Sequence, residues 1–284
     1  MKRFTTIDEM RRFSRAAERE RGLRLGLVPT MGALHEGHLS LVRAAREKCD
    51  AVAVSIFVNP TQFGPSEDFA KYPRDFTKDC AMLEQEGVNA VFAPAIEEMY
   101  PEQAFTWVTV EGMSDRLCGK SRPGHFRGVT TIVSKLFHIV EPDVAFFGQK
   151  DAAQVAIIRR MVRDLNIPVT IEVCPILREP DGLALSSRNA YLNTHERQSA
   201  LVLHRSLCRT HELFDRGERE PAKLIAAGKQ EFAKERSVRL DYFDVVDPDT
   251  LKAISTISGP ALVAVAAFVG NTRLIDNIVV KTKN

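Results

Sequence analysis

The sequence predicts an α/β protein with a Rossmann-like parallel sheet, helices on both faces of that sheet, and a smaller C-terminal α+β domain. Apolar strands alternate with amphipathic helices over residues 1–177, which is typical of a parallel sheet covered by helices. Beyond residue 177 strands follow strands, so we place a second, lid domain at 178–284. A chain of 284 residues also suits two hydrophobic cores better than one.

The first half of the chain opens with an amphipathic N-terminal helix. Two apolar runs, residues 23–30 and 51–60, then read as buried strands on either side of a helix over 39–50. A helix over 75–87 begins with Asp and ends with Gly, and a short strand over 89–94 follows it. This order of strand, helix and strand predicts parallel pairing.

The alternation continues to residue 176. Apolar residues at helical spacing predict a helix over 128–143, followed by a strand over 144–148, a helix over 151–166 and a strand over 169–176. In sheets of this kind, ligands bind at the carboxyl ends of the strands. The segments that follow the strands are therefore where we expect functional residues.

The C-terminal part follows a different pattern. A loop over 177–192 leads into two polar-faced helices and then into strands over 239–247, 261–269 and 273–280. The longest apolar run, which starts at Ala261, has the length of a buried strand and falls short of the ~18 residues of a membrane span.

Composition indicates a soluble globular protein. The chain is 44% hydrophobic and 27% charged, and its net charge of +2 is too small for a nucleic-acid-binding surface. The N-terminus lacks an apolar leader, so we expect neither export nor a membrane partner. Five scattered cysteines, odd in number and without a CxxC pair, indicate a reducing compartment, and we expect a cytoplasmic location.

The segment His35-Glu36-Gly37-His38 is the first candidate site. It follows a strand directly and opens a helix, whose N-terminal backbone N–H groups and partial positive charge suit a phosphate. A zinc site would need further ligands at short range, and the other histidines and cysteines lie far away in sequence. Two solvated turn histidines are the remaining alternative.

Two further segments carry groups that bind anions. Gly148 ends a strand and is followed by Lys150 and Asp151, with Gln154 one helical turn later. Lys150 suits a carboxylate or phosphate, and Asp151 suits a ribose hydroxyl or Mg²⁺. The loop Ser186-Ser187-Arg188 offers hydroxyls and a guanidinium that suit the outer phosphates of a triphosphate. A capped helix and a surface loop are the structural alternatives.

Two last segments suit a polar organic acid. One holds Asn59 and Gln62 just past a strand end, and the other holds Arg122, His125 and Arg127 among turn residues. Each segment alone can be an ordinary loop. Together, all five segments place phosphate or carboxylate binders at strand ends or in loops, which favours one shared site.

The stretches "PTMGALHEGH", "SIFVNPTQF", "YPR", "SRPGHFRGV", "FFGQKD" and "LALSSRN", in this order, resemble the pantothenate synthetases, the pantoate–β-alanine ligases. The resemblance spans residues 24–191, and "RLIDNI" near the end agrees more loosely. The family belongs to the HIGH-motif nucleotidyltransferases. The resemblance implies that MgATP and (R)-pantoate form pantoyl adenylate and pyrophosphate, after which β-alanine displaces AMP to give pantothenate. It also implies a homodimer.

The resemblance assigns roles to particular residues. His38, usually the proton donor in the family, and His35, Lys150 and Arg188 are expected to be catalytic. The substrate-binding residues are expected to be Gln62, Gln154, Asn59, Tyr72 and Arg122, with Gln62 serving both acids. The ATP site is expected to comprise Met31, Gly32, Ala33, Leu34, His35, Glu36, Gly37, His38, Gly148, Gln149, Lys150, Asp151, Leu177, Leu185, Ser186, Ser187 and Arg188.

The chain departs from the family pattern at two places. Gln149 stands where the family usually has Glu, and Ala152-Ala153 stands where bulkier residues are common. Loss of one negative charge beside a triphosphate leaves activity expected and ATP affinity open. Two other functions remain possible on the residues alone: a HIGH-type transferase that keeps the nucleotide in its product, and a nucleotide-binding module without catalysis.

Overall fold

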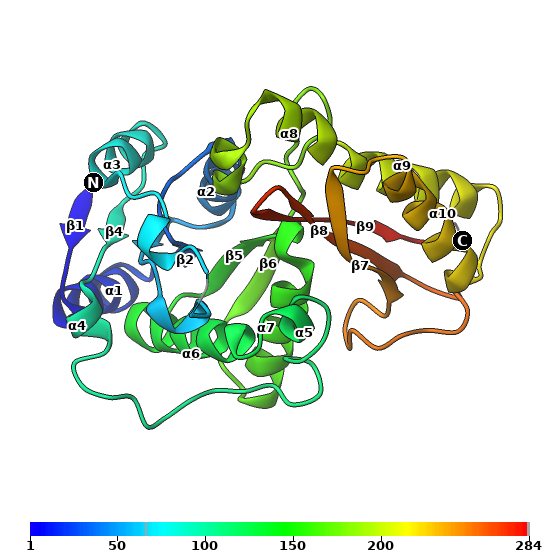
Figure 1. Cartoon of the computed structure of the whole chain (residues 1–284). Coiled ribbons are helices and arrows are strands. Elements are labelled where there is room, and N and C mark those ends of the chain that lie inside the picture. The colour runs from blue at the N-terminus through cyan, green and yellow to red at the C-terminus, as the bar shows by residue number, and fades with distance from the viewer. Residues whose placement is uncertain (66, 283–284) are drawn as a thin grey trace.

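The computed structural model describes residues 1–65 and 67–282 and contains two sheets (Figure 1). The parallel sheet consists of β1 (Lys2–Phe4), β2 (Leu25–Thr30), β3 (Ala51–Ile56), β4 (Ala90–Phe92), β5 (Val144–Gly148) and β6 (Thr170–Cys174). The antiparallel sheet consists of β7 (Val238–Val246), β8 (Ala261–Val269) and β9 (Thr272–Val280). The predicted α/β class with a smaller antiparallel unit is confirmed.

The order of the parallel strands defines where a ligand can enter. The sheet runs β1-β4-β3-β2-β5-β6, so β2 pairs with β3 on one side and with β5 on the other. After β2, the chain adds β3 and β4 on one side of that strand and then β5 and β6 on the other side. The carboxyl ends of β2 and β5 therefore border the crevice in which open α/β sheets bind their ligands.

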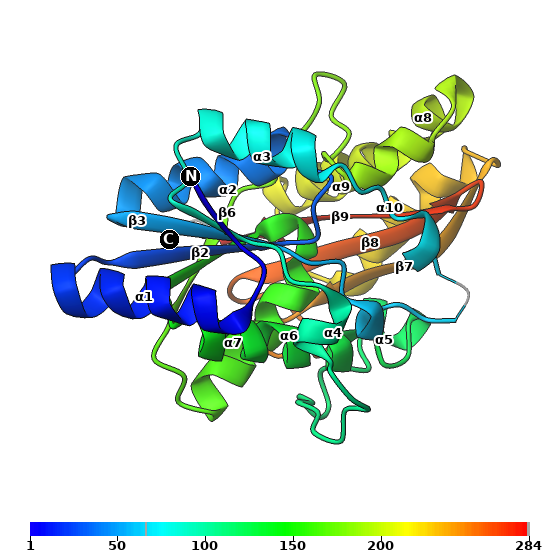
Figure 2. The ribbon, with the colours of Figure 1, turned by 90° about the vertical axis from the view of Figure 1, so that its left-hand side faces the viewer.

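Helices cover both faces of the parallel sheet, as predicted (Figure 2). One face carries α2 (Glu36–Lys48) and α3 (Phe76–Gln85), whose buried leucines and valines pack on the sheet. The other face carries α1 (Ile7–Arg21), α6 (His125–Val140) and α7 (Ala152–Asp164), which form the largest apolar cluster with the sheet. Burial on both faces explains why the central strands are nearly continuous apolar runs.

The C-terminal unit differs from the prediction in its helices. It has three, α8 (Thr194–Ala200), α9 (Val202–Asp215) and α10 (Pro221–Ala233), where the sequence predicts two. The single residue between α8 and α9, Leu201, keeps a right-handed helical backbone, so no Gly or Pro marks the break. Two short helices, α4 (Ile96–Met99) and α5 (Cys118–Ser121), were also not predicted.

Two further findings concern the location and chemistry of the chain. Within the described residues, none of the helices has both the length and the apolar character that crossing a membrane would require. All five cysteines are free thiols.

Candidate active site

The turn between β2 and α2 is held by a carboxylate from another helix. Asp79 of α3 is 2% exposed and accepts hydrogen bonds from the backbone N–H groups of Ala33 at 2.9 Å and Leu34 at 2.8 Å. Gly32 has φ +80°, and a Cβ there would lie 2.9 Å from Asp79 Oδ2. Burial raises the pKa of Asp79. Asp79 was not predicted from the sequence, although its place one helical turn before the buried Leu83 marks it as a polar residue on an apolar face.

The rings of His35 and His38 are in contact at the start of α2, tilted by 41° to each other. Gly37 N–H donates to His35 Nδ1 at 3.1 Å, His35 N–H donates to His38 Nδ1 at 3.4 Å, and the ring centroids lie 4.1 Å apart. A Cβ at Gly37 would lie 2.9 Å from the His35 ring, so a larger residue there would displace that ring. Because both Nδ1 atoms accept, the proton of each neutral ring is assigned to Nε2. The pair therefore offers two N–H donors.

Both histidines are neutral at pH 7. Burial, with a contribution from the charge of Lys150, lowers the pKa of His35 to about 4. Burial, the neighbouring His35 and Lys150 lower the pKa of His38 to about 3. The pair thus supplies dipoles rather than charges toward an anion. Zinc finds no support, since the described residues contain no group of three His, Cys, Asp or Glu side chains placed to hold a metal.

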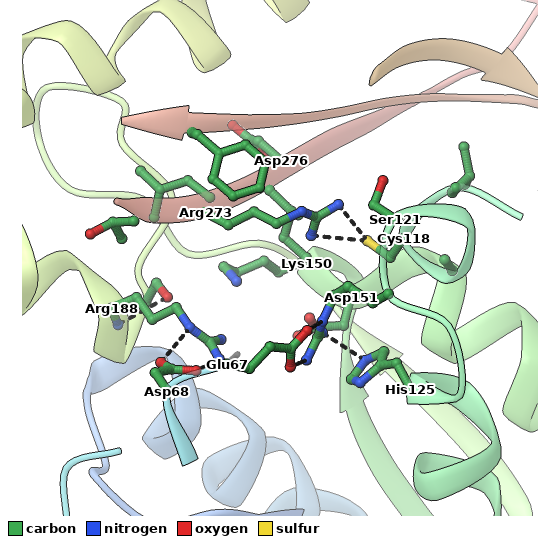
Figure 3. A pocket seen from close by; sticks show the side chains of 18 of the residues that line it. Glu67, Asp68, Cys118, Ser121, His125, Lys150, Asp151, Arg188, Arg273 and Asp276 are labelled. Atoms are coloured by element: carbon green, nitrogen blue, oxygen red, sulfur yellow. Dashed lines mark hydrogen bonds and ion pairs between the residues drawn. The ribbon is translucent and has the colours of Figure 1, made fainter. Parts of the chain in front are cut away.

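The segment Gln149–Asp151, which we call the lysine turn, joins β5 to α7. Lys150 and Asp151 line a cavity of about 800 Å³, which lies between the part of the chain that carries the parallel sheet and the part that carries the antiparallel sheet. Among the described residues, neither side chain makes a hydrogen bond or ion pair, and Figure 3 shows both facing the cavity. Ala152 and Ala153, the second departure from the family pattern, are buried and also line it, so only methyl groups project from this part of the wall.

Two arginines of the cavity are paired with carboxylates from one segment. Arg122 binds Glu67 through Nε at 2.7 Å and Nη2 at 2.6 Å. Arg188 binds Asp68 through Nε at 3.1 Å and Nη2 at 3.0 Å. Burial alone would raise the pKa of Glu67, but hydrogen bonds and charge from Arg122 bring it below the ordinary value. Figure 3 shows the pair of Arg188 and Asp68, with Glu67 beside it. Neither carboxylate was predicted from the sequence.

Asn59 and Gln62 lie in a turn after β3 that packs tightly on α6. Asn59 Nδ2 donates to Gln62 Oε1 at 3.1 Å and to the carbonyl of Gly128 at 3.1 Å. Gln62 Nε2 donates to Met31 Sδ at 3.0 Å. A Cβ at Gly128 would lie 2.3 Å from the carbonyl oxygen of Thr61, so only glycine permits this contact.

His125 connects this turn to Arg122. Its Nδ1 lies 2.8 Å from the carbonyl oxygen of Gln62 and its Nε2 lies 2.9 Å from Arg122 Nη1. A carbonyl can only accept and an arginine can only donate, so the ring carries its proton on Nδ1. Burial and Arg122 lower the pKa of His125 to about 4, which keeps it neutral. The guanidinium carbon of Arg127 lies over the Trp107 ring, 4.7 Å from the ring centre.

The structure brings part of the expected site into one cavity. Its lining includes Arg122, Lys150, Asp151, Gln154, Ser186 and Arg188. Tyr72 OH lies 3.3 Å from Ser187 Oγ, and the Arg188 guanidinium lies 5.9 Å from the centre of the Tyr72 ring. The residues expected in the site that do not line this cavity are Met31 to His38, Asn59, Gln62, Tyr72, Gly148, Gln149, Leu177, Leu185 and Ser187.

Comparisons with known proteins agree over nearly the whole chain. A family model described as pantoate-beta-alanine ligase matches residues 2–279. The pantothenate synthetase of Koribacter versatilis is 60% identical over 97% of this chain and 94% of its own. That of Moorella thermoacetica is 57% identical over 100% of both chains.

Solved structures give the same result. Pantothenate synthetase from Thermus thermophilus has a TM-score of 0.92 at 45% identity, covering 98% of this chain and 99% of that chain. Pantoate-β-alanine ligase from Francisella tularensis, crystallised with β-γ ATP and β-alanine, has a TM-score of 0.81 at 32% identity, with coverages of 98% and 97%. These matches place the chain in the pantoate-β-alanine ligase family.

Proposed function

We propose that this chain ligates (R)-pantoate and β-alanine to pantothenate in an ATP-dependent reaction that passes through pantoyl adenylate and releases AMP and pyrophosphate. The observation that carries the chemistry is the meeting of two turns. The His35–His38 turn at the end of β2 and the lysine turn at the end of β5 flank the point where the sheet order reverses. Lys150 lines the cavity there, and its charge acts on both histidines.

The first step needs no protein nucleophile, because the carboxylate of pantoate attacks the α-phosphorus of ATP. The site must hold two anions against each other and stabilise the charge that develops on the phosphates. We assign this role to Lys150 and Arg188, which are cations, and to the Nε2–H groups of His35 and His38. The ATP site is assigned to the β2–α2 turn, the lysine turn, Leu177 and the segment Leu185–Arg188, which we call the serine loop.

We assign the binding of pantoate and β-alanine to polar residues that follow β3 in the chain, up to and including the first turn of α7. Gln62 and Gln154 are proposed to bind pantoate by hydrogen bonds, with Gln62 also orienting β-alanine. Asn59 fixes Gln62 through its side-chain amide at 3.1 Å. Tyr72 and Arg122 complete the set, since a hydroxyl and a guanidinium both suit a carboxylate.

Mg²⁺ fits this site as a companion of ATP. Asp151 lines the cavity and, among the described residues, its carboxylate has no hydrogen-bond or ion-pair partner. Mg²⁺ is commonly held by one or two carboxylates together with substrate phosphates and water, rather than by an all-protein cage. We assign Asp151 as the protein ligand. When bound, the ion would neutralise part of the triphosphate charge.

In the second step the neutral amine of β-alanine attacks the adenylate carbonyl and AMP leaves. A good leaving group makes a strong general base unnecessary, and the site must keep water from the mixed anhydride. We propose that residues 178–284 form a lid domain over an ATP- and pantoate-binding domain of residues 1–177. The cavity supports this division, because residues of both parts line it.

The assembly and location of the chain are further proposals. We propose a homodimer, as the resemblance to the family implies. Light scattering of the purified protein would measure its mass directly. We propose a cytoplasmic location, which five unpaired cysteines support because reducing compartments keep thiols free.

The reaction is tested by incubating the purified protein with MgATP and (R)-pantoate, with and without β-alanine, while pyrophosphate, AMP and pantothenate are measured together. AMP and pantothenate that appear only when both acids are present support the ligase. Pyrophosphate release without AMP in the presence of β-alanine would instead indicate a nucleotidyltransferase. Binding of ATP without any product would indicate a non-catalytic nucleotide-binding module.

A further inference from the structure

Asn277 on β9 is a buried polar side chain that contacts the lysine turn from the other unit. It is 3% exposed, and its Nδ2 donates to the carbonyl oxygens of Gln149 and Lys150, both at 3.0 Å. Its Oδ1 accepts a hydrogen bond from Gln149 Nε2 at 2.9 Å. β9 is an edge strand of the antiparallel sheet and contacts the lysine turn.

These three hydrogen bonds tie the lysine turn to β9. The lysine turn is a single 3-10 turn, and the residue before it, Gly148, provides no side-chain cap. Both carbonyls are partly buried, so a turn that loses these two donors is no longer tied to β9 and its backbone is freer to move. The direction in which Lys150 leaves the backbone therefore depends on Asn277.

The preceding residue of β9 holds a second part of the expected ATP site. Asp276 is also 3% exposed and forms a two-bond ion pair with Arg178, at 2.6 and 2.9 Å. Arg178 follows Leu177 directly and also donates to the carbonyl of Gly182 at 3.0 Å, in the segment that leads to the serine loop. Figure 3 shows Asp276 on β9 on the same side of the cavity as Arg273.

We propose that Asn277 is a positioning residue that acts through Lys150. By fixing the carbonyls of the lysine turn, it aims the Lys150 ammonium at the nucleotide phosphates. With Asp276 it makes β9 the common support of the lysine turn and of the segment leading to the serine loop. This inference rests on the proposed function only in taking Lys150 as a phosphate ligand.

The test compares Asn277→Ala with Asn277→Asp in calorimetric titrations with MgATP and, separately, with pantoate. Alanine removes all three hydrogen bonds, while aspartate keeps the shape of the side chain but sets a carboxylate against two carbonyls. We expect the Kd for ATP to rise about tenfold or more in both variants, and at least as much in the aspartate variant, with the Kd for pantoate changed less than twofold. A purely packing role predicts the opposite order, because aspartate preserves volume.

The link to Lys150 is tested by a double-mutant cycle. If Asn277 acts through Lys150, then Asn277→Ala in a Lys150→Ala background changes the Kd for ATP less than twofold. If the increase in the Kd for ATP in the double variant equals the product of the increases in the two single variants, the inference is overturned. The stability control is Val280→Ala, a buried position at the end of the same strand that pairs with Ala261 of β8. An equal loss of ATP affinity in that variant at matched thermal stability would also overturn it.

Two additions keep the outcome decisive. If Asn277→Ala does not fold, Asn277→Ser is measured in its place; its hydroxyl can donate to only one carbonyl, and the same outcomes apply. The wild-type chain is assayed for pantothenate in parallel. A wild type that binds ATP but forms no pantothenate would refute the proposed ligase and leave the ATP-binding comparison intact.

Discussion

Replacing Gly128 with alanine is expected to weaken pantoate binding while leaving ATP binding nearly unchanged. The added Cβ would lie 2.3 Å from the carbonyl oxygen of Thr61 and 2.7 Å from the Cα of Gln62. These atoms belong to the backbone, so no side-chain rotation relieves the contact. An ordinary contact begins at 3.4 Å, and the turn that carries Asn59 and Gln62 must therefore move by about 1.1 Å, from 2.3 to 3.4 Å.

The size of the effect follows from that displacement. A misplacement of about 1 Å can lower catalysis by about 100-fold, and we expect the Kd for pantoate to rise by about 10- to 100-fold, or about 1.4–2.7 kcal/mol. Overpacking costs about 1–3 kcal/mol of unfolding free energy. The helix preference of alanine over glycine returns about 1 kcal/mol of that loss. The change in affinity should thus exceed the change in stability.

Calorimetric titration with pantoate and with MgATP, together with urea unfolding, separates these quantities. The matched control is Gly259→Ala, where a Cβ would meet nothing within 4 Å and should leave all three quantities unchanged. Unchanged pantoate affinity in a folded Gly128→Ala variant would refute the assignment of Gln62. Equal losses of pantoate and ATP affinity would show that the strain spreads through the whole site.

Three further predictions follow from the site. His38→Ala should lower single-turnover adenylate formation by about 10²- to 10³-fold with the fold intact, because one phosphate donor is lost; an unchanged rate would rule out this role. Asp79→Asn replaces one of the two acceptor oxygens by an amide, so urea unfolding should show that the free energy of unfolding is lower by about 1–3 kcal/mol, and ATP should bind more weakly. The control Asp75→Asn can still cap α3 and should be nearly neutral. Burial lowers the pKa values of His35, His38 and His125 to about 4, 3 and 4, below the ordinary 6.5. Below pH 6.5 the unfolded chain therefore binds more protons than the folded chain. The unfolding free energy should accordingly fall as the pH drops from about 6.5 toward 4. Equal stability in urea titrations at about pH 7 and pH 5 would contradict the third prediction.

Most of the parallel sheet could be predicted because its central strands are short apolar runs buried on both faces, and such runs leave a clear local signal. The edge strand β1 could not, since Lys2–Phe4 has three residues and its pairing with β4 depends on contact with a distant segment. The break between α8 and α9 was missed because Leu201 keeps a helical backbone.

The site shows the same division between local and distant information. Histidines, glycines and prolines just past strand ends marked the segments at the end of β2, β3 and β5 from sequence alone. The residues that hold those segments in place carry no such mark. Asp79 contacts a turn 45 residues away, and Asn277 contacts one 128 residues away, so only the folded chain reveals their partners.

The segment that carries Glu67 and Asp68 determines how the cavity behaves toward dissolved ions. Each of its carboxylates neutralises one arginine, and Lys150 lies next to Asp151 in sequence, so the cavity walls carry nearly balanced charge. A balanced cavity does not accumulate chloride or other small monovalent anions. In the proposed function, a nucleotide with several negative charges can instead displace Asp68 from Arg188, which makes binding selective for the valence of the anion. Competition by simple salts should accordingly be weak, and competition by polyphosphates strong.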